Sequence, residues 1–151
     1  KYGNIYDHFA CAYQWESGTR GYHFSRQQNG TMGSYEVELY GSKGSCSAKN
    51  RHTILTGESA WRYRGETNDM YQTEHDTLFD SIRKNAPFND GEKAANSTMV
   101  AIMGRMASYT GQKITFDQAL NSKEDLTPPH FDWDEKLPVP QAPVPGVTRF
   151  I

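Results

Sequence analysis

The amino-acid sequence predicts an α+β fold, in which an open, largely antiparallel β-sheet is backed on one face by two main helices and followed by an extended proline-rich carboxy-terminal arm. Three observations lead to this prediction. Up to residue 65 the apolar side chains alternate with a period of two, which is typical of half-buried strands. From Asn68 onward they recur with the period of an amphipathic helix. Six of the seven prolines lie beyond residue 126, where they favour an extended, polyproline-like conformation.

The first two expected strands form a hairpin. Residues 8–15 place one row of side chains on each face of the sheet: Phe9, Cys11, Tyr13 and Trp15 on one, and His8, Ala10, Ala12 and Gln14 on the other. The segment Glu16-Ser17-Gly18-Thr19 is typical of a hairpin turn. In the return strand, residues 20–28, Arg26 shares a face with Tyr22 and Phe24. We expect that aromatic face to be buried, so that the Arg26 charge needs a partner or a ligand.

Further strands are expected at residues 34–40, 45–49, 52–55 and 60–64. Asn29-Gly30 and Gly41-Ser42-Lys43-Gly44 are the turn signals between strands. Short turns between successive strands indicate an antiparallel meander. Neither glycine turn precedes a helix whose amino end would hold a phosphate. We therefore expect this chain alone to bind no dinucleotide cofactor.

Two main helices and one short helix are expected after the strands. The first has Asn68 or Asp69 as its N-cap and ends before Pro87. Its apolar stripe consists of Tyr71, His75, Leu78, Phe79 and Ile82. The second starts after Asn89-Asp90 and runs to Thr110, with small residues that would let another backbone approach closely: Ala101, Gly104, Ala107 and Ser108. Residues 114–116 predict a short strand, and Thr115 with Gln118 predicts a capping box for the last helix.

Composition restricts the partners that this chain is expected to have. It carries 16 Lys+Arg against 18 Asp+Glu and no long charge block, so we expect neither nucleic acid nor a membrane surface as a partner. Hydrophobic residues make up only 36%, which points to a fragment or an oligomer. Cys11 and Cys46 are expected to be two buried thiols in preference to one disulfide. No membrane span or targeting segment is recognised, which leaves cytoplasmic and periplasmic locations open.

Three residues are candidates for substrate contacts by their placement. His8 lies beside Ala10 and Ala12, which leave room above the sheet for an imidazole to meet a ligand. Arg26 is expected to make either a structural salt bridge or a ligand contact. His75 occupies an apolar stripe, which predicts that it is at least partly buried, either as a core histidine bonded to a backbone carbonyl or as a substrate contact. The histidines show no metal-binding spacing, and no catalytic set emerges.

The chain resembles the carboxy-terminal domain of the glucose–fructose oxidoreductase / inositol dehydrogenase family (Gfo/Idh/MocA), in the branch common in bacteria that degrade complex glycans. The segments that carry this resemblance follow one another along nearly the whole chain. They are Asn4-Ile5-Tyr6-Asp7-His8-Phe9, Arg26-Gln27, Tyr71-Gln72-Thr73-Glu74-His75, Ser81-Ile82-Arg83, Pro87, Asn89, Ser97-Thr98-Met99-Val100-Ala101-Ile102-Met103-Gly104-Arg105, Tyr109-Thr110-Gly111 and Val144-Pro145-Gly146-Val147-Thr148.

The resemblance implies a parent with an amino-terminal Rossmann domain that holds NAD(P), followed by a sheet that shapes a sugar or polyol pocket and pairs with neighbouring subunits. The family's Glu-Lys-Pro motif, which carries the catalytic lysine, has no counterpart here: Glu92-Lys93 is followed by Ala94, and Glu135-Lys136 by Leu137. No catalytic residue is therefore carried over. Arg26, Gln27, His8 and His75 are expected to line the substrate side of the cleft.

Residues 1–126 are accordingly expected to form an α+β substrate and oligomerisation domain, and residues 127–151 an extended arm. The expected partners are a sugar-like small molecule, the Rossmann domain of the parent and further copies of the chain. The rival hypothesis is a stand-alone carbohydrate-binding or protein-interaction module without redox activity. A third is a lineage that lost its cofactor domain. The sequence leaves open which sugar is bound and whether the cofactor of the parent is NAD or NADP.

Overall fold

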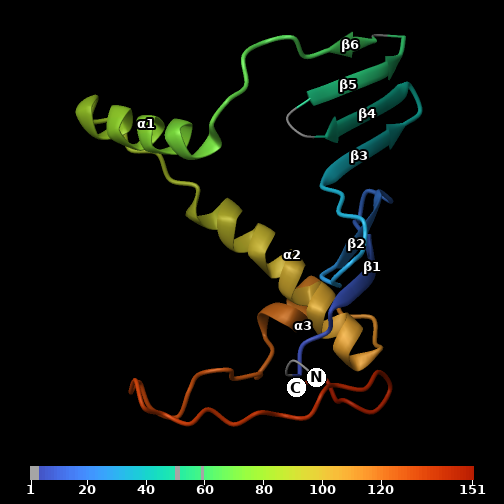
Figure 1. Ribbon diagram of the computed structural model, residues 1–151, viewed down its shortest axis with the longest axis vertical. Coiled ribbons are helices and arrows are strands. Elements are labelled where there is room, and N and C mark those ends of the chain that lie inside the picture. The colour runs from blue at the N-terminus through green and yellow to red at the C-terminus, as the bar shows by residue number, and fades with distance from the viewer. Residues whose placement is uncertain (1–3, 50–51, 59) are drawn as a thin grey trace. The chain divides into compact units, whose positions relative to one another are not determined.

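The computed structural model describes residues 4–49, 52–58 and 60–151, and these form an α+β structure with open antiparallel sheets (Figure 1). By their internal contacts the residues divide into two compact units. The first unit comprises Lys1–Asn29 and Asp90–Ile151, and the second comprises Gly30–Asn89.

The first unit is built on a β-hairpin covered by a long helix. Strands β1 (His8–Gln14) and β2 (Arg20–Arg26) pair antiparallel, in the register that sets His8 opposite Arg26 and Gln14 opposite Arg20. Gly18 has φ of 84° in the turn, a conformation that favours glycine. Helix α2 (Gly91–Thr110) packs against β1. It ends where expected, because Gly111 adopts the left-handed conformation with φ of 70° and donates its N–H to the Ala107 carbonyl.

A close approach between α2 and β1 depends on Gly104, as the small residues of this helix predicted. A Cβ atom at this position would overlap the hydroxyl oxygen of Tyr13 and lie 3.4 Å from Cys11 Sγ. Tyr13 donates its hydroxyl hydrogen to the Val100 carbonyl at 3.2 Å. Cys11 Sγ lies 3.3 Å from Ser108 Oγ. The odd-numbered side chains of β1 therefore face the helix.

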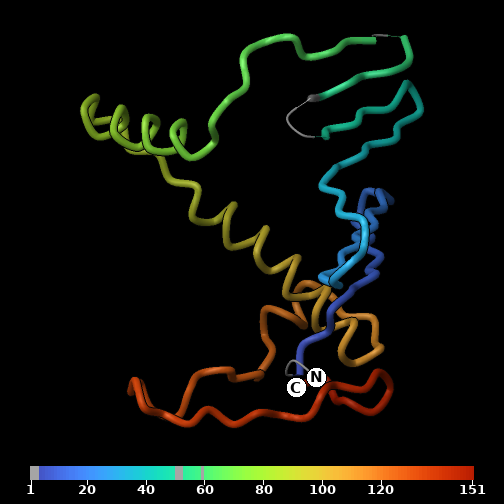
Figure 2. The backbone as a smooth tube through the Cα atoms, viewed as in Figure 1, coloured from blue at the N-terminus to red at the C-terminus, as the bar shows by residue number. Residues whose placement is uncertain are grey.

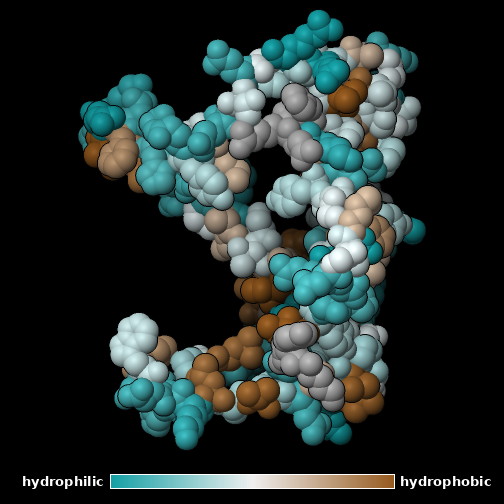
Figure 3. Space-filling model, viewed as in Figure 1, coloured by the Kyte–Doolittle hydropathy of each residue, from teal (hydrophilic) through white to brown (hydrophobic). Residues whose placement is uncertain are grey.

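The core of the first unit lies between α2 and the segments that follow it. Its buried hydrophobic residues are Met106, Ile114 and Ala119, with Phe150 packed against them. Helix α3 (Phe116–Leu120) carries the capping box between Thr115 and Gln118 that the sequence predicted. The expected strand at residues 114–116 is wrong, because Ile114 is buried ahead of the cap and Phe116 begins α3. Figure 3 shows hydrophobic side chains gathered around the carboxyl half of α2.

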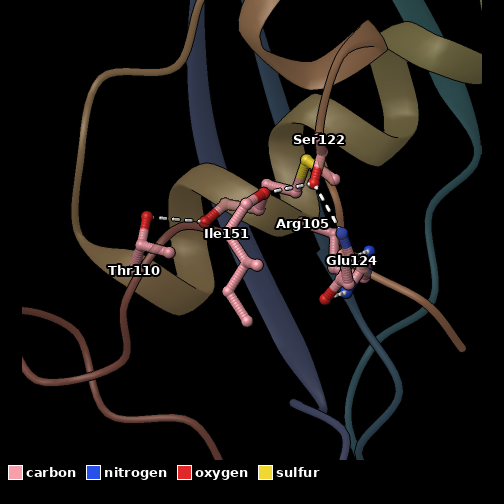
Figure 4. A network of polar contacts seen from close by, with 6 residues as sticks. Arg105, Thr110, Ser122, Glu124 and Ile151 are labelled. Atoms are coloured by element: carbon pink, nitrogen blue, oxygen red, sulfur yellow. Dashed lines mark hydrogen bonds and ion pairs between the residues drawn. The ribbon is translucent and has the colours of Figure 1, made fainter.

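The segment after α3 runs to residue 151 without helix or strand (Figure 2). Near its end it is anchored to α2, because the Gly146 N–H donates to the Thr110 carbonyl at 2.8 Å. Its two ends are joined to each other, because Ser122 Oγ donates to the Ile151 carbonyl at 2.6 Å. Beside them Arg105 pairs with Glu124 (Figure 4), and this carboxylate raises the pKa of the Arg105 guanidinium. The proline-rich arm is thus extended, and its apolar end docks on α2 and α3.

The second unit holds a four-stranded sheet and one helix. Its strands are β3 (Glu36–Gly41), β4 (Gly44–Lys49), β5 (His52–Gly57) and β6 (Trp61–Arg62), which pair antiparallel in chain order. Helix α1 (Met70–Arg83) starts at the N-cap Asp69, whose carboxylate accepts the backbone N–H groups of Tyr71 and Gln72.

The predicted α+β class and the open antiparallel sheets are confirmed, with two differences in detail. In the described ranges the strands form two sheets instead of one meander, and of the two main helices α2 alone packs on a strand. Within the described part of its own unit, α1 packs on no strand. The physical reason is that a residue-by-residue periodicity identifies an apolar helix face without identifying the surface that will cover it.

Candidate functional site

One face of the β1–β2 hairpin is left open by α2. Because directly opposed residues of an antiparallel pair point to the same side, the register assigns eight side chains to this surface. We call it the open face; its residues are His8, Ala10, Ala12 and Gln14 of β1, and Arg20, Tyr22, Phe24 and Arg26 of β2. All eight are exposed.

Two aromatic side chains form the centre of the open face. Tyr22 is 64% exposed and lies opposite Ala12, while Phe24 is 75% exposed and lies opposite Ala10. The alanine side chains are too small to cover the two rings, so the rings form a flat apolar surface over both strands. We call this surface the shelf. Burial of this aromatic row was expected and is wrong. The row of β1 that contains Phe9, Cys11 and Tyr13 packs under α2 instead, and the register then turns the aromatic row of β2 outward.

A polar cluster stands at one end of the shelf. His8 and Arg26 are cross-strand neighbours. His8 Nδ1 lies 2.7 Å from Asp7 Oδ1, and Gln28 donates to the other carboxylate oxygen of Asp7 at 3.4 Å. These two hydrogen bonds, that of His8 first, hold the pKa of the Asp7 carboxyl below its usual range. The structure thus brings His8 and Arg26 together, and Gln27 joins them through its backbone N–H, which donates to the Asp7 carbonyl at 2.7 Å.

This geometry gives the polar cluster both donors and acceptors. With Nδ1 engaged by Asp7, His8 presents Nε2 to solvent from a side chain that is 70% exposed. Arg26 adds a planar guanidinium, and Asp7 adds carboxylate oxygens. The expectation that Arg26 is a buried charge is wrong, since Arg26 is exposed. Its role at a ligand site stays a prediction.

His75 belongs to α1, in the second unit. Its Nδ1 lies 2.7 Å from the Tyr71 carbonyl oxygen, one helical turn earlier. The predicted bond to a backbone carbonyl is therefore present, but the predicted burial is wrong, because His75 is exposed. The same is true of the apolar stripe around it, where Leu78 is 52% and Ile82 is 63% exposed. Within the described residues of this unit nothing covers the stripe.

The β3–β6 sheet has one apolar and one polar face. The register places six side chains on the same side of the sheet, which we call the apolar face: Val37, Leu39, Cys46, Ala48, Leu55 and Trp61. Its side chains are open to solvent, with Leu39 62% and Trp61 51% exposed. On the other face Glu36 pairs with Lys49 at 3.1 Å, and Tyr40 donates to Glu38 at 2.8 Å. Polar side chains thus pair with one another on this face, whereas the apolar face is left uncovered in its own unit.

The two hollows found in the surface bring together none of the residues that the sequence singled out. One, of about 560 Å³, lies between α2 and residues 122–131 of the first unit. The other, of about 360 Å³, lies in the β3–β5 part of the second unit. On the open face the described structure brings together His8 and Arg26, whereas His75 belongs to the other unit.

Other site types were also sought among the described residues. These contain no group of three or more His, Cys, Asp or Glu side chains arranged to hold a metal ion. Gly41 and Gly44 flank a tight turn between β3 and β4, as predicted for a structural turn. Cys11 and Cys46 are free thiols. No helix in the described ranges is both long and apolar enough to cross a bilayer.

Comparisons with known proteins found no match, so the interpretation of the open face rests on its geometry. No protein-family model matches the chain, and no match was found among curated proteins or among solved structures.

Sequence reasoning missed Asp7 and the outward orientation of Tyr22 and Phe24. The orientation of these two rings depends on the observed register, which places Ala10 opposite Phe24 and Ala12 opposite Tyr22. Small residues facing large ones on one side indicate a shelf. The contact between Asp7 and His8 needs only their adjacency, which the alternation pattern did not consider.

Proposed function

We propose that this chain is the substrate-binding and oligomerisation part of an NAD(P)-dependent oxidoreductase that acts on a sugar, a polyol or a sugar derivative. The observation that supports the sugar-binding role is the open face, where two exposed aromatic rings adjoin a cluster of Asp7, His8 and Arg26. The nicotinamide chemistry is part of the proposal through the family resemblance alone.

The chemistry of a saccharide matches the two parts of this surface. One side of a sugar ring is lined by C–H groups, which stack favourably on an aromatic face, and its rim carries hydroxyl groups that donate and accept hydrogen bonds. Phe24 and Tyr22 supply the ring surface, and the Asp7 carboxylate and the Arg26 guanidinium supply acceptors and donors beside it. In this proposal these residues bind and orient the sugar, while the cofactor that accepts the hydride is held by the Rossmann domain.

The proposed oligomerisation uses the other unit. An uncovered apolar sheet face is costly in water and is typical of a surface that another protein covers. The apolar face of β3–β6 fits this description, since Val37 and Leu39 are 60% and 62% exposed. We propose that a second copy of the chain covers it.

The test of the proposed function is an assay of NAD(P)⁺ reduction by the natural full-length protein with a panel of sugars and polyols. The Phe24→Ala substitution is expected to raise KM by about fivefold, because the loss of a stacking contact is worth on the order of 1 kcal/mol. The matched control is Phe131→Ala, which removes a phenyl ring that is 89% exposed and is not part of the open face. Equal KM values in both variants would contradict the site assignment.

The rival function is a carbohydrate-binding module without redox activity. The observation in its favour is that the open face lies on one hairpin and needs no cofactor to bind a sugar ring. The same assay separates the two functions. Sugar binding by the natural protein without reduction of either cofactor supports the module and overturns the oxidoreductase.

A further inference from the structure

Two apolar surfaces of the second unit lie uncovered in the described structure. One is the apolar face of the β3–β6 sheet, where Leu39 and Trp61 are exposed. The other is the apolar stripe of α1, where Tyr71, Leu78 and Ile82 are each more than half exposed. Among the described residues of this unit, α1 packs on no strand. Exposed apolar surfaces of this kind are typical of sites that another protein surface covers.

The stripe and the apolar face match in length and in shape. Helix α1 has 14 residues and is about 21 Å long, and the six-residue strands β3, β4 and β5 are about 20 Å long. At one end of the face the register aligns Gly41, Gly44 and Gly57 on three neighbouring strands. Because no side chain stands on this row, it leaves room for an aromatic ring of the stripe, such as that of Tyr71.

The polar groups of the two surfaces also match. The register places no Lys, Arg, Asp or Glu on the apolar face of the described strands, and Thr53 supplies one hydroxyl there. His75 is the polar member of the stripe; its Nδ1 donates to the Tyr71 carbonyl, which leaves Nε2 to accept from a hydroxyl. Arg83 lies over the Phe79 ring at 5.7 Å, at the margin of the stripe. A helix seated on the face therefore places no charge at the centre of the contact.

We propose that the apolar face of one copy is covered by α1 of a second copy, and that the two copies exchange these helices around a two-fold axis. This inference rests on the proposed oligomerisation, because it names the element of the partner that makes the contact. The helix comes from a second copy because α1 contacts none of the described strands of its own unit.

The area of the proposed contact is sufficient for a stable dimer. Each stripe and each face offers on the order of 400 Å² of exposed apolar side chains. The two symmetry-related contacts together bury about 1,600 Å², the usual size of a stable protein–protein interface. Exchange covers both surfaces in both copies, whereas face-to-face packing of two sheets would leave the stripes of α1 exposed.

The test cross-links two single-thiol variants of the chain with a short bis-maleimide. One variant is Cys11→Ser, which keeps Cys46 on the apolar face. The other combines Cys11→Ser, Cys46→Ser and Leu78→Cys, so that its thiol lies in the stripe of α1. One variant is isotopically labelled, and mass spectrometry separates the products. Mixed dimers are expected to be the main product, and to become about tenfold less abundant when Thr77→Cys replaces Leu78→Cys, because Thr77 lies on the opposite side of the helix.

Sedimentation velocity gives an independent measurement. Ile82→Lys places a charge in the stripe and is expected to raise the dimer dissociation constant about a hundredfold, as is Leu39→Lys on the apolar face. Thr77→Lys is the control and is expected to leave the dissociation constant unchanged.

Each outcome of these experiments answers one question. Cross-links chiefly between two Cys46 thiols, or an oligomer that Ile82→Lys leaves intact, overturn the exchange of helices and leave the proposed oligomerisation standing. An intramolecular cross-link at high dilution, in a chain that carries both Cys46 and Leu78→Cys, shows that α1 covers its own sheet and also overturns the inference. A monomeric natural chain overturns the inference together with the proposed oligomerisation.

Discussion

At the scale of single residues, the contact between Asp7 and His8 determines the chemistry of the polar cluster. The imidazole donates to the Asp7 carboxylate, and this hydrogen bond is the main cause of the lowered pKa of Asp7. Since the folded-state pKa lies below the unfolded value of about 3.9, the interaction stabilises the fold above that pH. The stabilisation is lost as the pH falls through the folded-state pKa.

The His8→Ala substitution removes this donor and is expected to raise the pKa of Asp7 toward its usual value. The measurement is an NMR titration of the Asp7 side-chain carboxyl carbon. His23→Ala is the matched control, because His23 lies on the same hairpin but opposite Cys11, on the other face. An Asp7 pKa that is unchanged by His8→Ala, or shifted equally by the control, would show that the contact does not form in solution.

At the scale of elements, the packing of α2 on β1 positions the open face. Gly104 permits this packing, and its replacement by Ala introduces a methyl group where the Tyr13 hydroxyl lies. We expect Gly104→Ala to destabilise the protein by about 1–3 kcal/mol through overpacking, against a gain of about 1 kcal/mol in helix propensity. Thermal unfolding followed by circular dichroism measures the net change.

A second substitution identifies the cause of that loss. Tyr13→Phe removes the hydroxyl that occupies the space beside Gly104, at the cost of its hydrogen bond to the Val100 carbonyl. In the Tyr13→Phe background, Gly104→Ala is therefore expected to cost less than in the natural sequence. Strictly additive losses would mean that the two elements do not meet at this point.

The β3–β6 sheet gives an element-scale prediction about self-association. Leu39 and Tyr40 are adjacent on β3 and both exposed, but they point to the apolar and the polar face respectively. If the apolar face is the contact between copies, Leu39→Lys is expected to dissociate the oligomer, since it would bury a charge. Tyr40→Lys is expected to leave it intact. Sedimentation velocity at micromolar concentration measures both, and a monomeric natural chain would remove the hypothesis.

At the scale of the whole molecule, local patterns predicted the elements better than their packing. The α+β class, the hairpin at Gly18, the N-cap at Asp69 and the capping box at Thr115 depend on neighbouring residues, and all are confirmed. Burial of His75 and Phe24 depends on what covers a face, and both predictions failed. Alternation states which side chains share a face; the register and the covering helix decide which face is buried.

For the candidate site, too, local patterns predicted the placement of single residues, and packing decided the rest. His8 was placed on the side of the small residues and is found there, and Arg26 was placed with Tyr22 and Phe24 and is found with them. The sequence did not show that these two rows form one surface, because that requires the pairing of β1 with β2. His75 is part of the other unit and stays a candidate on the resemblance alone.

The most direct test of the central claim is an NMR titration of the isotopically labelled chain with sugars and polyols, in which the backbone amide shifts are followed residue by residue. The account predicts that the shifts perturbed by a binding sugar belong to the open face, led by Ala10, Ala12, Tyr22 and Phe24. Phe24→Ala is expected to abolish these shifts while the spectrum of α2 is preserved. Perturbations confined to other surfaces, or the absence of any perturbation across the panel, would contradict the claim that the open face binds sugar.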